Sequence, residues 1–246
     1  MNRRQFLTYL TTAAASWLLR RSSIRLGGEF VLFMWSGALT NTSIRVKARL
    51  NLDSDSVRLV ASTQPDLNNP IFTGYAAANS TNNRVASLNL SGLTTNTTYH
   101  YTIEAEGQRS SLRGRFHTPT SSLFSFSFAC ASCAQTGSDH TVFTTIQQNN
   151  PLFFIHLGDF HYQDIGSNDV NRFRQAFNTV LASSTQADLY RHLPLAYIWD
   201  DHDYGPNDSD GTSPSRTAAR LTYQEYVPHY PFVSGTGDVL LVVTPF

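Results

Sequence analysis

The sequence predicts an α/β protein in which an N-terminal β-sandwich precedes a domain built on a parallel sheet. Residues 30–118 hold short segments that alternate apolar and polar side chains between turns rich in Asn, Ser, Thr and Gly, which is typical of a β-sandwich. After residue 119, continuous apolar runs alternate with segments of helical periodicity, which is typical of a parallel sheet covered on both faces. The composition, with 41% hydrophobic and 15% charged residues, is that of a globular protein with a sizeable core.

Residues 1–28 are predicted to form an export signal of the twin-arginine type. Arg3 and Arg4 are followed by the tripeptide QFL and then by a mostly apolar run. This run is too short and too polar to cross a membrane, which takes about 20 apolar residues. We therefore expect recognition by the twin-arginine (Tat) export machinery, a periplasmic or extracellular location and no stable membrane span. An amphipathic N-terminal helix is the alternative.

The charge of the chain is unevenly distributed. The formal net charge is zero, so the sequence carries no signal for binding nucleic acid. Five arginines lie in the first 25 residues, which leaves 13 basic and 18 acidic side chains in the remainder. Between residues 159 and 210 there are nine aspartates and only three arginines. This local excess of acid is suited to binding cations.

The β-sandwich domain is predicted to span residues 29–119, with strands at 30–35, 43–50 and 98–106. The second and third of these strands alternate clearly. Side chains expected to face the core are Ile44, Val46, Ala48, Leu50, Tyr99, Tyr101, Ile103 and Ala105. Side chains expected to face solvent are Arg45, Lys47, Arg49, His100, Thr102, Glu104 and Glu106. Residues 117–122 form the linker to the next domain.

The second domain is predicted to span residues 120–246 and to alternate strands with helices. Its strands are expected at 123–129, 152–157 and 195–199, and its helices from residue 138 or 139, over 168–182 and over 213–226. Ser138 or Asp139 is suited to cap the first helix, and Pro214 to lie in the first turn of the third. Sites in such sheets form where loops leave the carboxyl ends of the strands.

Polar clusters follow each of the three strands predicted for this domain. The first strand leads to Cys130 and Cys133, the second to GDFHY at 158–162, and the third to DDHD at 200–203. Two carboxylates about 6 Å apart repel by about 2.8 kcal/mol at an effective dielectric constant near 20, so they take up protons or bind cations. Thiol and phenol groups beside carboxylates favour a softer or strongly Lewis-acidic metal, with oxygen ligands for a harder one. The sequence therefore predicts a two-metal centre that makes hydroxide and holds a phosphoryl group.

These clusters have two alternative interpretations. An EF-hand with Gly211 as the loop glycine would put Pro206 at position 1 and Thr217 at position 12, and neither is a ligand of the required kind. The motif formed by Cys130 and Cys133 is also compatible with a disulfide or a redox pair in an exported protein.

Four segments of the chain resemble the alkaline phosphatase D (PhoD-like) family of metallophosphatases. They are SCAQTGSDHTVF, FFIHLGDFHY, PLAYIWDDHDYGPNDSD and YVPHYP, in the order of the family. The resemblance implies a sandwich of the fibronectin III or Ig-like type, followed by the N-terminal portion of a metallophosphatase α/β/β/α domain. It also implies a phosphomonoesterase or phosphodiesterase that uses a metal-activated hydroxide.

The resemblance further implies a role for individual residues. Cys133, Asp159 and Tyr162 would ligate a ferric ion (Fe3+), with Asp159 bridging to a second metal, typically calcium (Ca2+). Asp201 would ligate the second metal, and His202 would face the phosphate as the catalytic residue. The side chains expected to support these groups, or to add calcium ligands, are His161, Asp203, Asn207 and Asp208.

One part of the family pattern is not found in this sequence. The family takes further His and Asp ligands from a later G-D-x-H-like region, whereas the last residues here are LLVVTPF. We therefore expect a C-terminally truncated chain, either a fragment or a shortened gene product, with an incomplete metal site. An inactive remnant or a surface binding module is the alternative to the hydrolase, and a thiol–disulfide oxidoreductase is a third interpretation.

Overall fold

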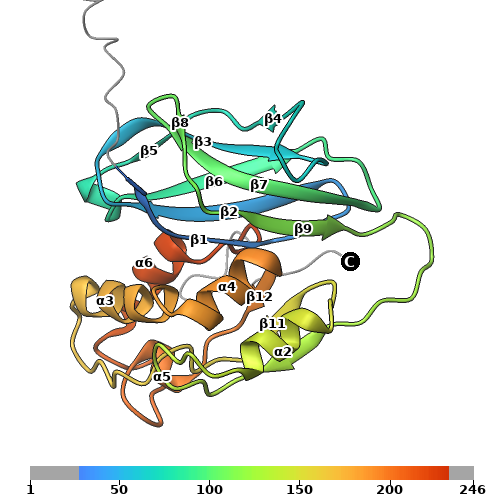
Figure 1. The fold of residues 1–246 in the computed structure, drawn as a ribbon. Helices are drawn as coiled ribbons and strands as arrows, with labels where there is room; N and C mark the ends of the chain where they lie inside the picture. Colours follow the sequence, from blue (N-terminus) through green and yellow to red (C-terminus); the bar gives the residue numbers. More distant parts are fainter. Residues whose placement is uncertain (1–27, 233–246) are drawn as a thin grey trace, which may run out of the picture.

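The computed structural model describes residues 28–232 (Figure 1). The predicted twin-arginine signal and the apolar run at 239–244 lie outside these residues. The predicted fold class is confirmed, because a strand-rich N-terminal part is followed by a mixed α/β part. Among residues 28–232, none of the helices has the length and apolar character that a bilayer crossing requires.

The strands form two sheets of six. The strands of the first sheet, in spatial order, are β10 (Ala129–Ala131), β11 (Phe154–His156), β12 (Leu195–Tyr197), β1 (Val31–Gly37), β2 (Ser43–Leu50) and β6 (Val85–Ser91). The second sheet consists of β4 (Ile71–Phe72), β3 (Ser54–Ser62), β7 (Thr97–Ala105) and β8 (Gln108–Arg109), with β5 (Ala76–Ala78) paired to β3 and β9 (Gly114–Thr118) paired to β7. A 3-10 turn, η1 (Ser80–Asn82), precedes β6.

The core of the sandwich forms between antiparallel strands of the two sheets. In β2, Val46 pairs with Leu88 of β6, and in β3, Leu59 pairs with Ile103 of β7. All the apolar side chains predicted to face inward from β2 and β7 are buried. The alternation predicted for these two strands therefore identifies the core correctly, because a strand with one buried face imposes a period of two on the sequence.

Three of the polar side chains predicted to face solvent are buried instead. Lys47 lies under α6 (Arg216–Tyr226) and donates a hydrogen bond to the carbonyl of Gln224. Glu104 forms ion pairs with Arg58 and Arg109, and Thr102 donates hydrogen bonds to backbone carbonyls at residues 110 and 112. The prediction was wrong here because neighbouring segments cover the outer faces of β2 and β7 and supply partners for the polar groups.

The first sheet continues from the sandwich into the α/β part. Strand β1 runs parallel to β12, where Gly37 pairs with Leu195. A side chain at Gly37 would place its β-carbon 2.5 Å from the Leu195 carbonyl oxygen, so this close approach requires glycine. The buried indole of Trp35 donates a hydrogen bond of 2.9 Å to the carbonyl of Tyr226 in α6.

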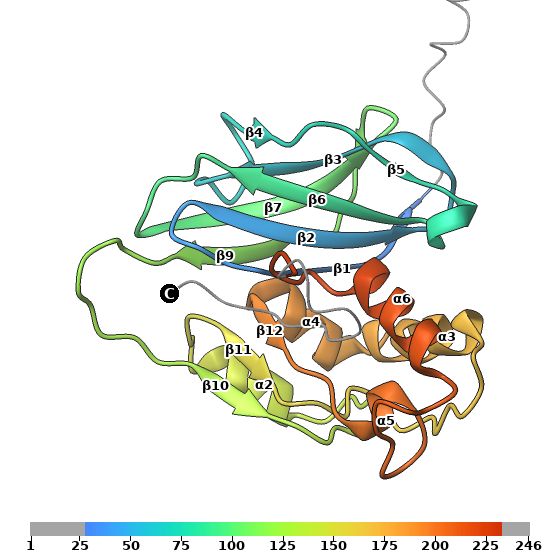
Figure 2. The same cartoon turned by 180° about the vertical axis from the view of Figure 1, so that it is seen from behind.

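Helices cover one face of β11 and β12. They are α2 (Val142–Gln148), α3 (Val170–Leu181), α4 (Ser184–His192) and α6, while α5 (Asp201–Tyr204) follows the end of β12. Phe154, His156 and Tyr197 point from the strands into the core on this side. In Figure 2, which is turned by 180°, β10 and β11 lie in front of α2.

The opposite face of these strands is open in the described part of the chain, so the prediction of a sheet covered on both faces was wrong for residues 28–232. Ile155 and Ala196 are only partly buried, and Ile198 is exposed. No described helix packs on this face, because α2, α4 and α6 all contribute their apolar side chains to the other one.

Other predicted elements are present with shifted bounds. The strand expected at 123–129 is formed only at 129–131, and residues 121–128 are exposed. Asp139 does not cap α2, which begins at Val142; its carboxylate accepts hydrogen bonds from the backbone of Ser184 and Thr185 at the start of α4. Helix α4 itself was missed.

Candidate metal centre

Three loops of the α/β part begin at the same edge of the sheet. Strands β10, β11 and β12 are parallel, and Ala131, His156 and Tyr197 lie in register. The polar clusters that the sequence places after each strand therefore converge, as expected for carboxyl ends of parallel strands.

The loop after β11 turns sharply to present Asp159. Gly158 has a φ of 98°, and a β-carbon on it would overlap the β-carbon of Asp200. Asp159 and Cys133 also have positive φ angles, of 54° and 60°. Such left-handed conformations are enriched in Asp but unfavourable for most residues, and they cluster at functional sites. The backbone N–H of Cys133 donates to the carbonyl of Gly158, which joins the first loop to the second.

Asp159 lies at the centre of the cluster and is only 6% exposed. Its Oδ2 accepts a hydrogen bond from the Tyr162 hydroxyl at 2.8 Å and from the Cys133 thiol at 3.4 Å. Its Oδ1 is buried and has no hydrogen-bond partner among the described residues. Because a buried carboxylate oxygen without a partner is strongly disfavoured, a cation is the simplest group to satisfy it.

Asp201 and His202 complete a group able to bind a metal ion. One ligand-capable atom from each of Asp159, Asp201 and His202 lies within 4.8 Å of the other two. Asp201 begins α5, and its carboxylate accepts a hydrogen bond of 2.5 Å from the backbone N–H of Asp208. This bond holds the pKa of Asp201 below its usual value, so the side chain is ionised.

His202 is held on two sides. Its Nδ1 lies 2.8 Å from Oδ1 of Asp164, and its ring lies 4.4 Å, centroid to centroid, from that of Tyr162. Partial burial lowers the pKa of His202, but the bond to Asp164 and the charges of Asp159 and Asp201 outweigh it and raise the pKa above 6.5. The sequence prediction did not include Asp164. The only feature of the sequence that could have indicated Asp164 is its position in the same loop as Asp159. Its pairing with His202 depends on the tertiary structure.

Asp203 ties two of the loops together. Its carboxylate accepts hydrogen bonds from the backbone N–H groups of Phe160, at 2.7 Å, and Asp200, at 3.1 Å. Asp200 in turn caps α5. The side chain of Asp203 is 3% exposed, and burial raises its pKa to about 7. These contacts give Asp203 a role in holding the loop of Asp159 against the helix of Asp201.

The other residues predicted to support the ligands lie at different depths. The backbone of Asp208 bonds to Asp201, and Asn207 donates a hydrogen bond of 2.7 Å to the carboxylate of Asp208. His161 is fully buried against Phe173 and Phe177 and is not in the group that could hold a metal. Burial lowers the pKa of His161 to about 4, so its ring is neutral.

The two cysteines are exposed and not joined to each other. Only Cys133 contacts the carboxylate cluster, through its thiol. Cys130 lies within β10, upstream of the loop. Both thiols are free, which does not support the interpretation as a disulfide.

The structure of the chain matches solved structures, whereas its sequence matches no family model or curated protein. A solved structure of PhoD superimposes with a TM-score of 0.75 and 18% sequence identity, over 88% of this chain and 50% of that chain. Fibronectin III domains of chicken CNTN1 match with a TM-score of 0.31 and 17% identity, over 38% of this chain and 33% of that chain. A fibronectin III domain of human collagen XX matches with a TM-score of 0.28 and 19% identity, over 35% of this chain and 85% of that chain.

The chain thus spans about half the length of the PhoD chain that it matches. The match covers most of this chain with a TM-score of 0.75, and at an identity of 18% it shows the fold alone. The chain has a PhoD-like fold.

Proposed function

We propose that this chain is part of an exported, metal-dependent phosphoric ester hydrolase that acts on phosphate mono- or diesters. The observation that carries the proposal is the convergence of Asp159, Asp201 and His202 at the carboxyl ends of parallel strands, with one buried oxygen of Asp159 unpaired. The PhoD-like fold supports the same reaction class. The Tat signal and the periplasmic or extracellular location rest on the sequence of residues 1–28.

The donor atoms around Asp159 fit two metal ions of different character. A phenol and a thiol meet one oxygen of this carboxylate, and phenolate and thiolate are suited to a ferric ion. Asp201 offers only oxygen atoms, which suit calcium. When bound, two such ions would supply a metal-activated hydroxide and neutralise charge on the phosphoryl group.

Metal binding at this site should depend on pH. Burial, together with the neighbouring Cys133 and Asp159, raises the pKa of Tyr162 above its usual value of 10. Tyr162 and Cys133 must lose their protons to act as ligands, so each ion bound there releases protons.

Of the three converging residues, Asp159 and Asp201 are assigned to the metals and His202 to the phosphate ester. Its Nδ1 is engaged by Asp164, which leaves Nε2 to face a substrate. The raised pKa favours the imidazolium form, which stabilises negative charge and can protonate the leaving-group oxygen. Asp164 fixes the ring orientation and stabilises its positive charge.

The test is metal content and hydrolysis measured on the same preparations of the full chain. Wild-type protein should bind iron and calcium and hydrolyse p-nitrophenyl phosphate or bis(p-nitrophenyl) phosphate. Asp159→Asn should lose the metals and reduce kcat by at least about 100-fold. Asp55→Asn, an exposed aspartate of β3, is the matched control and should change neither quantity. Wild-type protein that binds neither metal would overturn the proposal.

The alternative, a binding module without catalysis, has one supporting observation on the sandwich. The guanidinium of Arg58 lies 4.0 Å from the ring centre of Phe72 and 5.2 Å from that of Tyr75, and Tyr75 is 62% exposed. An exposed aromatic and arginine platform of this kind is suited to stacking with a planar ligand. Metal binding without hydrolysis of either ester would favour this alternative.

A further inference from the structure

A polar pocket of about 170 Å3 lies between α3 and the loop that carries Asp164. Gln163 and Ile165 line it from the loop, and Arg172, Gln175, Ala176 and Thr179 line it from the helix. Pockets for drug-sized ligands have volumes of about 300–1,000 Å3, so this one suits a smaller ligand. None of the described residues that line it is acidic, although nine aspartates lie between residues 159 and 210. The pocket therefore differs in charge from the acidic stretch of sequence around it.

Arg172 brings an unpaired positive charge to this pocket. Of the arginines in residues 28–232, it is the one whose guanidinium has no hydrogen bond, ion pair or ring contact. The two other arginines of the acidic stretch are paired, Arg174 with Glu225 and Arg191 with Asp188. Because a guanidinium stays charged and carries five N–H donors, Arg172 is free to bind an anion.

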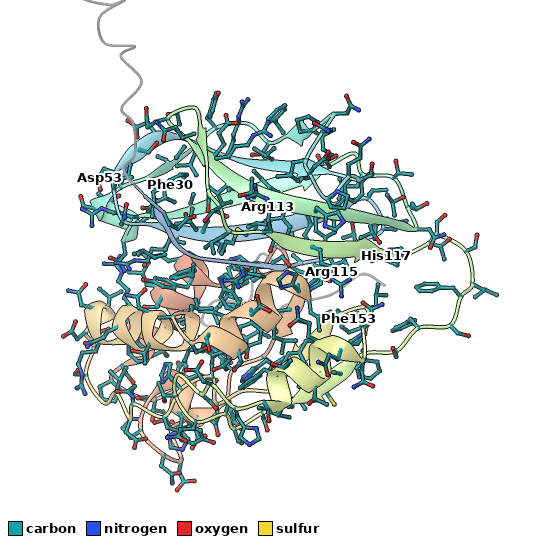
Figure 3. The ribbon with its side chains drawn as sticks, in the orientation of Figure 1. Phe30, Asp53, Arg113, Arg115, His117 and Phe153 are labelled. Atoms are coloured by element: carbon teal, nitrogen blue, oxygen red, sulfur yellow. The ribbon has the colours of Figure 1, made fainter. Side chains whose placement is uncertain are left out.

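Arginines elsewhere in the described part of the chain are held by neighbouring groups. Figure 3 labels two of them on the sandwich, Arg113 and Arg115. Arg113 donates a hydrogen bond of 2.6 Å to the carbonyl of Ser110. Arg115 donates one of 2.9 Å to the side chain of Asn150. The lack of a partner at Arg172 is therefore a feature of this pocket and not a general property of the arginines that the structure describes.

The other polar groups of the pocket add hydrogen-bond donors. Arg172, Gln175 and Thr179 recur at a spacing of three and four residues, which places them on one face of α3. Gln163 lines the same pocket from the loop. Within residues 28–232 neither glutamine amide has a hydrogen-bond partner, and each amide has two N–H donors. One guanidinium and two amides match the negative charge and the three strong acceptor oxygens of a phosphate group.

We propose that this pocket binds one phosphate group, held by the guanidinium of Arg172 and the side-chain amides of Gln163 and Gln175. Two sources supply such a group: free phosphate, which a phosphomonoesterase releases, and the phosphate of a second ester molecule. None of the lining residues belongs to the group that could hold a metal ion. Binding at this pocket therefore does not depend on the proposed hydrolase activity.

An occupied pocket would steady the loop that orients His202. Gln163 and Ile165 flank Asp164, whose carboxylate lies 2.8 Å from Nδ1 of His202. Ile165 is 1% exposed and packs with α3 and α6, whereas Gln163 is exposed. A phosphate group that bridges Gln163 to Arg172 ties down the side of the loop that lacks such packing. This consequence rests on the proposed function, in which His202 acts on the ester, and it makes Gln163 and Arg172 positioning residues.

Modification of the full chain with phenylglyoxal, which reacts with accessible guanidinium groups, tests the binding step. Inorganic phosphate at about ten times its Kd should slow the modification of Arg172 about 10-fold, relative to chloride at equal ionic strength. Peptide mass spectrometry measures the rate at each arginine. Arg84, which is paired with Asp53 and has a side chain 38% exposed, is the internal control, and its rate should not change.

Variants of the pocket test which groups hold the anion. Gln175→Ala should weaken phosphate binding about 10-fold, because a hydrogen bond to a charged group is lost. Gln148→Ala, an exposed glutamine at the end of α2, is the matched control and should leave the Kd unchanged. Equal modification rates of Arg172 in phosphate and in chloride, or an unchanged Kd in Gln175→Ala, would overturn the proposal.

Phenylphosphonate, which cannot be hydrolysed, separates the two sources of the phosphate group. Protection of Arg172 by inorganic phosphate alone identifies the free ion as the ligand. Protection by both compounds identifies the phosphate group of an ester as a ligand as well, and either result supports the pocket.

Hydrogen–deuterium exchange on the full chain tests the effect on the loop. Phosphate should slow the exchange of amides at 163–166 in wild type and not in Arg172→Gln, with the amides of β7 as the reference for a folded chain. Slowing that persists in Arg172→Gln, or is absent from wild type, would overturn the link between the pocket and Asp164. Neither readout uses ester hydrolysis, so protection of Arg172 in a protein that binds no metal would uphold the pocket and overturn only the proposed function.

Discussion

Asp164 and His202 form a carboxylate–imidazole pair, with Oδ1 of Asp164 2.8 Å from Nδ1 of His202. The two residues come from different loops, one following β11 and the other in α5. Asp164 has a φ of 44°, which is an unfavourable left-handed conformation, at the position where its carboxylate contacts the imidazole ring of His202. This pair sets both the orientation of the ring and the charge that it carries.

Asp164→Asn should reduce kcat about 10- to 100-fold with little change in KM, if the full protein hydrolyses phosphate esters as proposed. The amide keeps the hydrogen bond but removes the negative charge that raises the pKa of His202. The imidazolium is therefore lost at lower pH, and the alkaline limb of the kcat profile should move to lower pH. Gln148→Ala, an exposed glutamine at the end of α2, is the control. An unchanged pH profile in Asp164→Asn would show that the pair has only a structural role.

Gly158→Ala should lower the free energy of unfolding by at least about 2 kcal/mol and weaken metal binding. The added β-carbon meets Asp200, and the φ of 98° is unfavourable for alanine. Gly211→Ala is the matched control, since a β-carbon there meets no atom within 4 Å and no left-handed φ is involved; its effect should stay within about 0.5 kcal/mol. Urea denaturation and metal titration measure both quantities. Equal effects of the two substitutions would contradict the assigned role of Gly158.

Much of the fold could be predicted from the sequence because burial imposes regular patterns on it. The alternation in 43–50 identifies β2 with its bounds, and the apolar run at 152–157 identifies β11. Helix α3 was found for the same reason, since its apolar side chains recur at helical spacing. The strand at 123–129 was predicted as one of the apolar strands of the second domain, but it is formed only at 129–131, and among the described residues no layer covers its phenylalanines.

Only those residues of the site that come directly after a predicted strand could be brought together from the sequence. Asp159 and Asp201 come directly after apolar runs, so their convergence follows from a parallel sheet. The roles of Asp164 and Asp203 depend on contacts between loops that are 38 and 43 residues apart, which no local pattern encodes. Lys47 and Glu104 were assigned to solvent for the same reason, because their partners lie far away in the sequence.

Cys133→Ser should remove at least about 90% of the bound iron, whereas Cys130→Ser should leave the metal content unchanged. Only Cys133 touches Asp159, and a hydroxyl is a poorer ligand than a thiolate for the softer position of the site. Metal analysis of the two variants purified in parallel measures this difference. Loss of iron in both variants, or in neither, would contradict the distinct roles of the two cysteines.

Glu29→Gln should lower the free energy of unfolding by about 1 kcal/mol at neutral pH, after allowance for the solvent exposure of this residue. The carboxylate accepts hydrogen bonds from the backbone of Val31 and from the backbone and hydroxyl of Ser111, and another from the hydroxyl of Ser110. Partial burial opposes ionisation, but these bonds outweigh it and lower the pKa of Glu29 from 4.5 to about 2.

A carboxyl whose pKa is lower in the folded state stabilises the protein above its unfolded pKa, and this contribution is lost as the pH falls through the folded value. The difference in unfolding free energy between wild type and Glu29→Gln should therefore be constant above about pH 4.5 and shrink between pH 4.5 and 2. Urea denaturation across this range measures it. A difference that persists unchanged to pH 2 would mean that the hydrogen bonds do not depend on the charge of Glu29.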